Sequence, residues 1–181
     1  MSYINIGSVY DAKFEYDKAL EYFQKALAID LKTKAADHPD VAQNYNNIGV
    51  VYNKKAEYDH ALEYFQKALT IELKQLGPDH PSVAASYINI GVVYDTKREY
   101  DKALEYYQKS LAIYLKHLDP DHPDVAMSYN NIGSVRDSMG EYDQALEYYQ
   151  KALAIKLKQL GPGHPSVATS YNNMAYVYYV K

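Results

Sequence analysis

The sequence predicts an all-α protein of the α-solenoid class, in which helical hairpins stack on one another and no single closed core forms. Three observations predict it. Residues 45–78 return 42 residues later as 87–120 and again from Tyr129 onward, and a fixed period of roughly 20 to 50 residues is typical of stacked repeats. Each unit holds two runs with helical spacing of apolar residues, and small residues recur at fixed places in every unit.

The period arranges residues 1–181 as one repeat array. Its units cover about 1–36, 37–78, 79–120 and 121–162, with a terminal half-unit at 163–181. The chain starts within the first helix of one unit and ends within that of another. Because repeat arrays usually carry polar capping elements at their ends, we expect this chain to be part of a longer array.

The first helix of each unit, called helix A, is clearest at residues 83–94. Larger apolar residues recur there every three or four positions, which places them on one face of a helix. Pro81 lies at the expected first turn, where the missing N–H of proline leaves no helical hydrogen bond unmade. We expect the tyrosines of this face to pack in the core. The face consists of Val83, Tyr87, Ile90 and Tyr94.

The second helix, called helix B, follows at residues 61–76 and shows the same spacing. It is filled with Leu, Ala, Glu, Gln and Lys, which are all good helix formers. Gly77 and Pro78 then follow, and this pair is a common signal for the end of a helix.

Small residues mark where helices A and B should come close. Glycine inside a helix costs ~0.5–1 kcal/mol relative to alanine, so its repeated use indicates that a neighbouring helix approaches at that point. The positions are Gly7, Gly49, Gly91, Gly133 and Ala175 in helix A, and Ala19, Ala61, Ala103 and Ala145 in helix B.

Composition excludes several function classes. The net charge is -4 with acids and bases interspersed, whereas nucleic-acid binding needs clustered Lys and Arg; we therefore expect no nucleic-acid partner. No cysteine is present, which excludes disulfides and thiolate chemistry. No apolar run approaches the ~18 residues of a membrane span, and the N-terminus has no signal-peptide pattern. We expect a cytoplasmic protein with no membrane association.

The repeating motif resembles the tetratricopeptide repeat. The usual unit of that family has about 34 residues, whereas this one has 42, and the longer unit with its LGPDHPSVAASY link looks like the kinesin light chain subgroup. The resemblance implies a right-handed superhelix of hairpins with long B helices, in which A helices line the concave side. The motif residues in one unit are Tyr45, Ile48, Gly49, Tyr52, Tyr58, Asp59, Ala61, Phe65 and Ala68.

The chain departs from the family pattern in three places. The turn between helices A and B usually carries glycine, but here it holds Phe14, Ala56 and Arg98, and only Gly140 follows the rule. Arg136 replaces the tyrosine found in the other units. The first link, LKTKAADHPD, lacks the Leu-Gly-Pro stop, so its geometry is expected to differ.

The face of helix A opposite the core carries the predicted binding residues. The resemblance implies that this face lines a groove that binds peptides, so the expected partner is a protein or peptide. One position is asparagine in all five copies; we call Asn5, Asn47, Asn89, Asn131 and Asn173 the asparagine column. The predicted groove residues are Asn5, Asn46, Asn47, Val50, Asn53, Lys54, Asn89, Val92, Asp95, Asn130, Asn131, Ser134 and Asn173.

Two interpretations of the asparagine column stay open. A primary amide offers a carbonyl acceptor and two N–H donors, so it can bind a peptide backbone unit. Packed helices lie ~8–10 Å apart and an extended peptide advances ~3.3 Å per residue, so one amide per layer would meet a peptide every few residues. Alternatively, each asparagine bonds a neighbouring helix and ties the repeats together.

Two ligand classes of the family fit poorly. Some tetratricopeptide proteins hold acidic chaperone tails with lysine and asparagine, but no lysine occurs at the early helix A positions here. Kinesin light chain grooves use basic residues for acidic cargo peptides, whereas the only prominent cation of this face is Lys54.

The sequence predicts no enzyme, no cofactor and no metal site. His38, His80, His122 and His164 recur once per unit, too far apart to converge within the ~2–2.3 Å of one ion that metal ligation requires; we expect them to cap the turn. Carboxylates at one per unit do not form the close pair that acid–base catalysis uses.

Two functions remain in view. The first is a recognition module that binds a partner segment in the groove. The second is a structural scaffold that self-associates, since the terminal helix has no following helix B and a large exposed apolar patch marks an association site. The residues expected at that patch are Tyr171, Met174 and Tyr178.

Overall fold

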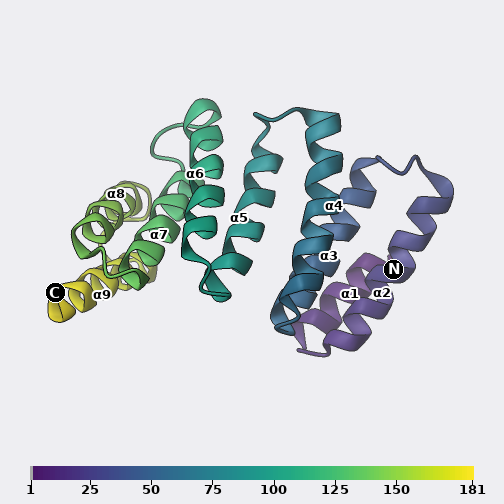
Figure 1. Cartoon of the computed structure of the whole chain (residues 1–181), viewed down its shortest axis with the longest axis horizontal. Coiled ribbons are helices and arrows are strands. Elements are labelled where there is room, and N and C mark those ends of the chain that lie inside the picture. The colour runs from purple at the N-terminus through teal and green to yellow at the C-terminus, as the bar shows by residue number, and fades with distance from the viewer. Residues whose placement is uncertain (1) are drawn as a thin grey trace. The chain divides into compact units, whose positions relative to one another are not determined.

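The computed structural model describes residues 2–181, and within them the chain is helical with no strand. Helices A and B alternate as the sequence predicts, so the all-α hairpin architecture is confirmed (Figure 1). The A helices are α1 (Tyr3–Ala12), α3 (Pro39–Lys54), α5 (Pro81–Thr96), α7 (Pro123–Ser138) and α9 (Pro165–Val180). The B helices are α2 (Tyr16–Thr33), α4 (Tyr58–Leu76), α6 (Tyr100–His117) and α8 (Tyr142–Leu160).

Each A helix from α3 onward begins at a proline that is capped by the preceding histidine. The Nδ1 atom of His38 accepts the backbone N–H of Asp40 at 3.1 Å, and that of His164 accepts the N–H of Ser166 at 3.1 Å. His80 and His122 do the same. Because the first N–H groups of a helix have no internal partner, this bond fixes where the helix starts. The predicted capping role of the four histidines is confirmed.

The turn between helices A and B keeps one geometry whether or not it holds glycine. Phe14, Ala56, Arg98 and Gly140 have φ angles of 62°, 60°, 60° and 76°, all in the left-handed region that side chains with a Cβ disfavour. The sequence departure therefore does not change the path of the chain. Phe14, Ala56 and Arg98 instead hold the strained backbone conformation that glycine would adopt without cost.

The B helices end in two ways. After α4 and α8, Gly77 and Gly161 have φ angles of 82° and 78°, as the Gly-Pro signal predicts. Where that glycine is absent, α2 and α6 are one residue shorter, and the next residue is extended. The first link does differ in geometry, as predicted.

The chain divides into two compact units, Met1–Val93 and Tyr94–Lys181. In the first, Ala19, Leu20 and Phe23 of α2 pack with Ile48 and Val51 of α3. In the second, Ala145, Leu146 and Tyr149 of α8 pack with Val177 of α9. In both units a B helix thus contacts the A helix of the following repeat, which is the stacking that the repeat pattern predicts.

The helical glycines lie where a large ring closes on helix A. A Cβ atom at Gly49 would lie 2.8 Å from the ring of Phe65, and one at Gly133 would lie 2.9 Å from the ring of Tyr149. The predicted close approach of helices A and B at these positions is confirmed. Cβ atoms in proteins essentially never come closer than 3.0 Å to another heavy atom of this kind, and both distances are shorter than that. Neither site therefore accepts alanine without displacing the ring.

Many tyrosines lie half-buried along the hairpins, where they form stacked pairs. Tyr52 stacks on Tyr64 with ring centroids 5.5 Å apart, and the Lys67 ammonium lies 4.9 Å from the Tyr64 centroid. Tyr94 and Tyr106 stack in the same way. The predicted packing role of the tyrosines on this face is confirmed for Tyr52, which packs against the cluster around Ile48. Its half-buried ring covers the edge of the core, where a phenol can keep its hydroxyl near water.

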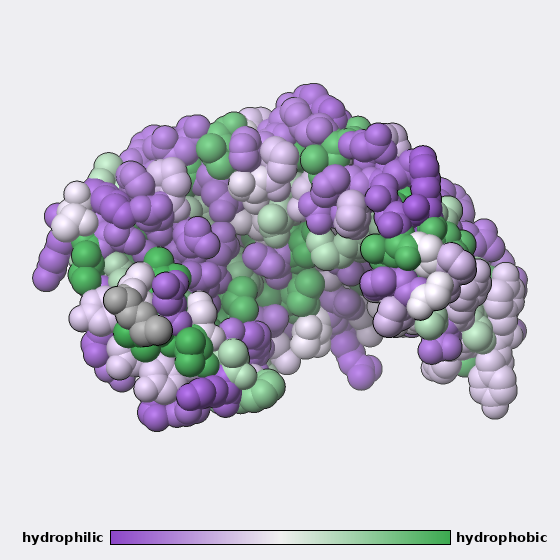
Figure 2. Space-filling model, turned by 180° about the vertical axis from the view of Figure 1, so that it is seen from behind, coloured by the Kyte–Doolittle hydropathy of each residue, from purple (hydrophilic) through white to green (hydrophobic). Residues whose placement is uncertain are grey.

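The face of the molecule shown in Figure 2 is largely polar. In Figure 2, hydrophilic residues cover most of the face that is shown, and hydrophobic residues form separate small patches. Among the helices of residues 2–181, none combines the length and the apolar character that crossing a bilayer requires.

Candidate functional site

A pocket of about 420 Å³ lies in the first compact unit, between α3, α4 and the start of α5. Helix A residues form two of its walls, and the end of helix B forms the third. Four of the predicted groove residues, Asn46, Asn47, Val50 and Asn89, line it. The other lining residues are Pro39, Ala42, Gln43, Ile71, Glu72, Gln75, Leu76, Ser82, Ala85 and Ser86.

Glu72 of α4 is the charged group of this pocket, and it is only 9% exposed. Its Oε1 atom accepts the side-chain N–H of Asn46 at 3.0 Å. Its Oε2 atom accepts the hydroxyl of Ser86 at 2.6 Å. Both donors are neutral, and in the described part of the chain no cation lies within ion-pair distance of this carboxylate.

Asn46 leaves a second acceptor in the same place. Its amide N–H is committed to Glu72, and its Oδ1 atom is buried with no hydrogen-bond partner among residues 2–181. A carboxylate accepts hydrogen bonds only, so the amide orientation is fixed by Glu72. The Asn46 carbonyl oxygen is therefore a second acceptor close to the Glu72 carboxylate.

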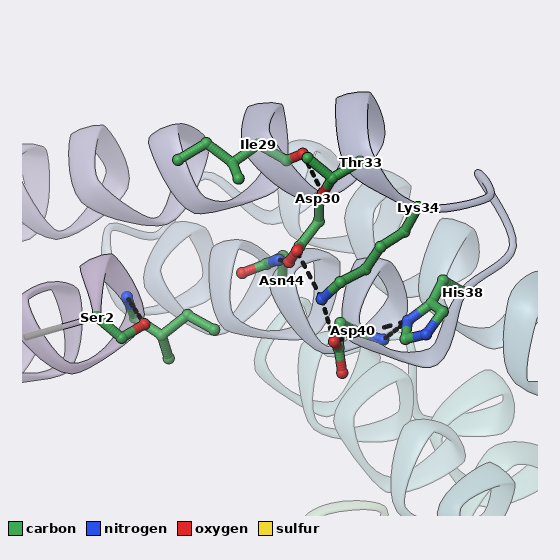
Figure 3. Close-up of polar contacts among 9 residues, drawn as sticks. Ser2, Ile29, Asp30, Thr33, Lys34, His38, Asp40 and Asn44 are labelled. Atoms are coloured by element: carbon green, nitrogen blue, oxygen red, sulfur yellow. Dashed lines mark hydrogen bonds and ion pairs between the residues drawn. The ribbon is translucent and has the colours of Figure 1, made fainter.

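The corresponding place one repeat earlier is built from the same positions but is neutralised internally. Asp30 of α2 occupies the Glu72 position, in a pocket of about 350 Å³. It accepts the amide of Asn44 at 2.7 Å and pairs with Lys34 at 2.8 Å. Figure 3 shows Lys34 reaching between Asp30 and Asp40. These two hydrogen bonds raise the pKa of Lys34 above its ordinary value.

The second compact unit has an equivalent pocket of about 250 Å³, formed by α7, α8 and the start of α9. Here Lys156 stands at the Glu72 position and donates to the hydroxyl of Ser170 at 2.8 Å. Burial lowers the pKa of Lys156 below its ordinary value. Met127 and Asn130 complete the wall from helix A. The same place in the repeat therefore carries opposite charge in the two units.

The asparagine column is half-exposed in the middle repeats. Asn47, Asn89, Asn131 and Asn173 are partly buried, and Asn5 is exposed. No hydrogen bond of these five side chains is present in the part of the chain that the structure describes. The neighbouring Asn46 differs, because its bond to Glu72 ties α3 to α4.

The remaining predicted groove residues differ in their surroundings. Asn130 lines the pocket of the second unit, while Val92 and Ser134 are half-buried. Lys54 is bound by both carboxylate oxygens of Asp11, at 2.9 and 2.7 Å, so its charge is already compensated. The Oδ1 atom of Asn53 is buried without a partner among residues 2–181.

Two groove carboxyls lie partly buried. Burial raises the pKa of Asp95 and that of Asp137 above their ordinary values. They occupy the position that Asn53 holds one repeat before Asp95 and two repeats before Asp137.

On the terminal helix, Tyr171 and Tyr178 are 52% and 60% exposed. Met174 is half-buried and packs against the cluster around Tyr149. The predicted patch is therefore formed by tyrosines, with Met174 turned toward α8.

Sequence reasoning missed Glu72, Lys156 and Ser86. The sequence pattern singles out the exposed face of helix A, whereas the charges of these pockets come from the last turns of helix B. A signal was present, because the position reads Asp30, Glu72, Tyr114 and Lys156 in a chain whose units otherwise agree closely.

Comparison with known proteins gives one family. A profile of the tetratricopeptide repeat matches residues 1–72, 45–116, 98–158 and 124–179. No curated protein matches the chain significantly.

Solved structures agree with the profile. A crystal structure of nearly identical TPR-like repeats from Podosopora anserina, assigned to kinesin light chain, is 25% identical and superposes with a TM-score of 0.83, covering 98% of this chain and 84% of that one. BtubC (BKLC) from P. vanneervenii is 23% identical, with a TM-score of 0.85 over 96% of this chain and 69% of its own. The apo form of RapI is 22% identical, with a TM-score of 0.83 over 98% and 62%. The last two show likeness of fold alone.

Proposed function

Because this chain belongs to the tetratricopeptide repeat family, whose repeats are generally protein–protein interaction modules, we propose that it binds a segment of a protein partner on the exposed face of its A helices. It does so as a module without catalytic activity of its own. The partner segment lies against the asparagine column.

The observation that supports this proposal is the state of the asparagine column. These amides are half-exposed and make no hydrogen bond to a neighbouring helix in the described part of the chain. Each therefore offers its carbonyl oxygen and its two N–H groups to a ligand. The amides of Asn47 and Asn89 both line the pocket of the first unit.

The proposal is tested by selecting binders from a displayed library of random peptides on the immobilised 181-residue chain. The best peptide is then measured by fluorescence anisotropy against the triple variant Asn47→Ala, Asn89→Ala, Asn131→Ala. We expect its affinity to fall at least about tenfold, because each lost amide removes hydrogen bonds of ~0.5–1.5 kcal/mol.

The chain offers a matched control. Gln66, Gln108 and Gln150 are also exposed amides that recur once per repeat, but they lie on helix B. Replacing these three by alanine should leave peptide affinity unchanged. If the asparagine variant folds and binds as tightly as the glutamine variant, the A-helix face is not the binding site.

Self-association is the second candidate, and the observation in its favour is the row of exposed tyrosines on α9. Tyr176 and Tyr179 are 59% and 88% exposed, beside Tyr171 and Tyr178. If this face binds a second copy, sedimentation equilibrium should show a dimer that Tyr178→Ser together with Tyr171→Ser weakens. A strict monomer over the whole concentration range would remove this candidate for the 181-residue chain.

A further inference from the structure

We propose that the pocket of the first unit binds a basic side chain, arginine or lysine, of the partner segment, and that Glu72 is its counter-ion. This inference rests on the proposed function, since it assumes that a peptide lies on the A-helix face. It adds the chemical class of the residue that the pocket selects.

The first argument is the uncompensated charge. Glu72 is more than nine-tenths buried, yet both of its hydrogen-bond donors are neutral. A buried carboxylate is normally paired with a cation, because hydrogen bonds alone do not replace the water it loses. The buried, unpartnered Oδ1 of Asn46 adds a second acceptor to the same pocket.

The second argument comes from the preceding repeat, which shows what completes such a site. There Asp30 is neutralised by Lys34, and Lys34 also reaches Asp40. One repeat later, Leu76 stands where Lys34 stands, and Ser82 stands where Asp40 stands. Glu72 keeps the acidic group of Asp30, but neither the lysine nor the second aspartate that the lysine contacts is present in this repeat. A cation for Glu72 must therefore come from a ligand.

The third argument is the shape and lining of the pocket. A volume of about 420 Å³ accommodates a long side chain. Ile71, Leu76 and Val50 provide apolar contacts for its methylene groups, which basic side chains readily bury while the charged end reaches a polar group. The guanidinium of arginine carries five N–H donors, and these suit a carboxylate whose present donors are both neutral.

The test uses the random peptide library on the folded 181-residue chain. On the unaltered protein, selected peptides should carry arginine or lysine at one aligned position. Replacing that residue by glutamine in the best peptide should weaken binding at least about tenfold, as the loss of one partner of a buried charge pair does. Glu72→Gln should abolish the basic preference and reduce affinity for the basic peptide by a similar factor.

Two further variants make the test specific. Leu76→Lys recreates the internal cation of the preceding repeat, so it should also remove the basic preference while Glu72 stays in place. Lys156→Gln changes the equivalent position of the other unit and should leave the basic preference intact. Circular dichroism and urea midpoints establish that each variant is folded, and Glu72→Gln keeps the shape needed for the bonds to Asn46 and Ser86.

The outcomes separate this inference from the proposed function. Peptides that are enriched without a basic residue, or that bind Glu72→Gln as tightly as the original protein, overturn the inference and leave peptide binding standing. Enrichment of no peptide at all overturns both. Selection of acidic residues that depends on Glu72 would also contradict the inference, because a buried carboxylate repels them.

Discussion

The ring that closes onto the helical glycine is that of Phe23 or Phe65 in the first unit, but that of Tyr149 in the second. Tyr149 is 3% exposed. Burial, and to a smaller degree the nearby charge of Asp137, raises the pKa of Tyr149 from 10.0 to about 12. The phenol is thus held in its protonated form by the fold.

We predict that Tyr149→Phe makes the protein less sensitive to alkaline pH. Because the pKa of this phenol is higher in the folded than in the unfolded state, its contribution to stability is complete below pH 10 and is lost as pH rises toward 12. The urea midpoint of the variant should fall less over this range than that of the original protein. Tyr179→Phe, at an exposed position, is the matched control and should leave the pH profile unchanged.

The equivalent glycine of an earlier repeat, which faces Phe65, gives a second prediction at the same scale. Gly49→Ala places a Cβ atom 2.8 Å from the buried ring of Phe65, so the variant should lose ~1–3 kcal/mol of unfolding free energy through overpacking.

Gly163 has no atom within 4 Å of an added Cβ, so Gly163→Ala should change stability by less than about 0.5 kcal/mol. Urea denaturation followed by circular dichroism compares the two. Equal stability of both variants would show that the close approach at Gly49 carries no strain.

At the scale of the element, the hairpin turn is where the repeats conflict with local preference. Ala56 and Arg98 have φ angles of 60°, and a residue with a Cβ in this region costs ~1–2 kcal/mol. The cost persists because the packed helices on either side determine the path of the turn. Only position 140 of these turns carries glycine, the residue that this conformation favours.

We therefore expect Ala56→Gly and Arg98→Gly each to stabilise the protein. The gain should be about 0.5–1 kcal/mol, because the strain that is relieved is partly offset by the greater freedom of glycine in the unfolded chain. Gly140→Ala should destabilise by a comparable amount. Thermal melting followed by circular dichroism measures all three, and a loss of stability in both glycine variants would contradict the strain argument.

At the scale of the whole molecule, stability should add repeat by repeat. In both units a B helix packs on the A helix that follows it, so we expect every repeat to contribute its own term and one interface term.

It follows that appending one more 42-residue unit should raise the melting temperature. A tail of identical composition but scrambled order serves as the control and should leave it unchanged. Differential scanning calorimetry measures both, and an equal melting temperature for the two chains would mean that the interface between successive repeats contributes little.

By itself, the sequence determined the helices, their ends and the close contacts of the hairpin. The helix starts at the prolines, the helix end at Gly77 and the close approach at Gly49 were all predictable. Each of them depends on backbone geometry within one or two turns. The repeat copies these local rules, so one unit predicts the next. The asparagine column and the exposed face of helix A were predictable for the same reason, and they stay a proposal as a binding site.

Only the tertiary structure decided what lies at the floor of the pocket. Glu72, Asn46 and Ser86 come from three different helices, and whether an acid there has a cation beside it depends on side chains that meet across those helices. The sequence shows Leu76 and Lys34 at equivalent positions. Only the ion pair between Asp30 and Lys34 in the structure shows that this difference removes the cation beside the acid. Charge compensation depends on contacts between helices, and the repeat pattern of the sequence does not show which side chains meet.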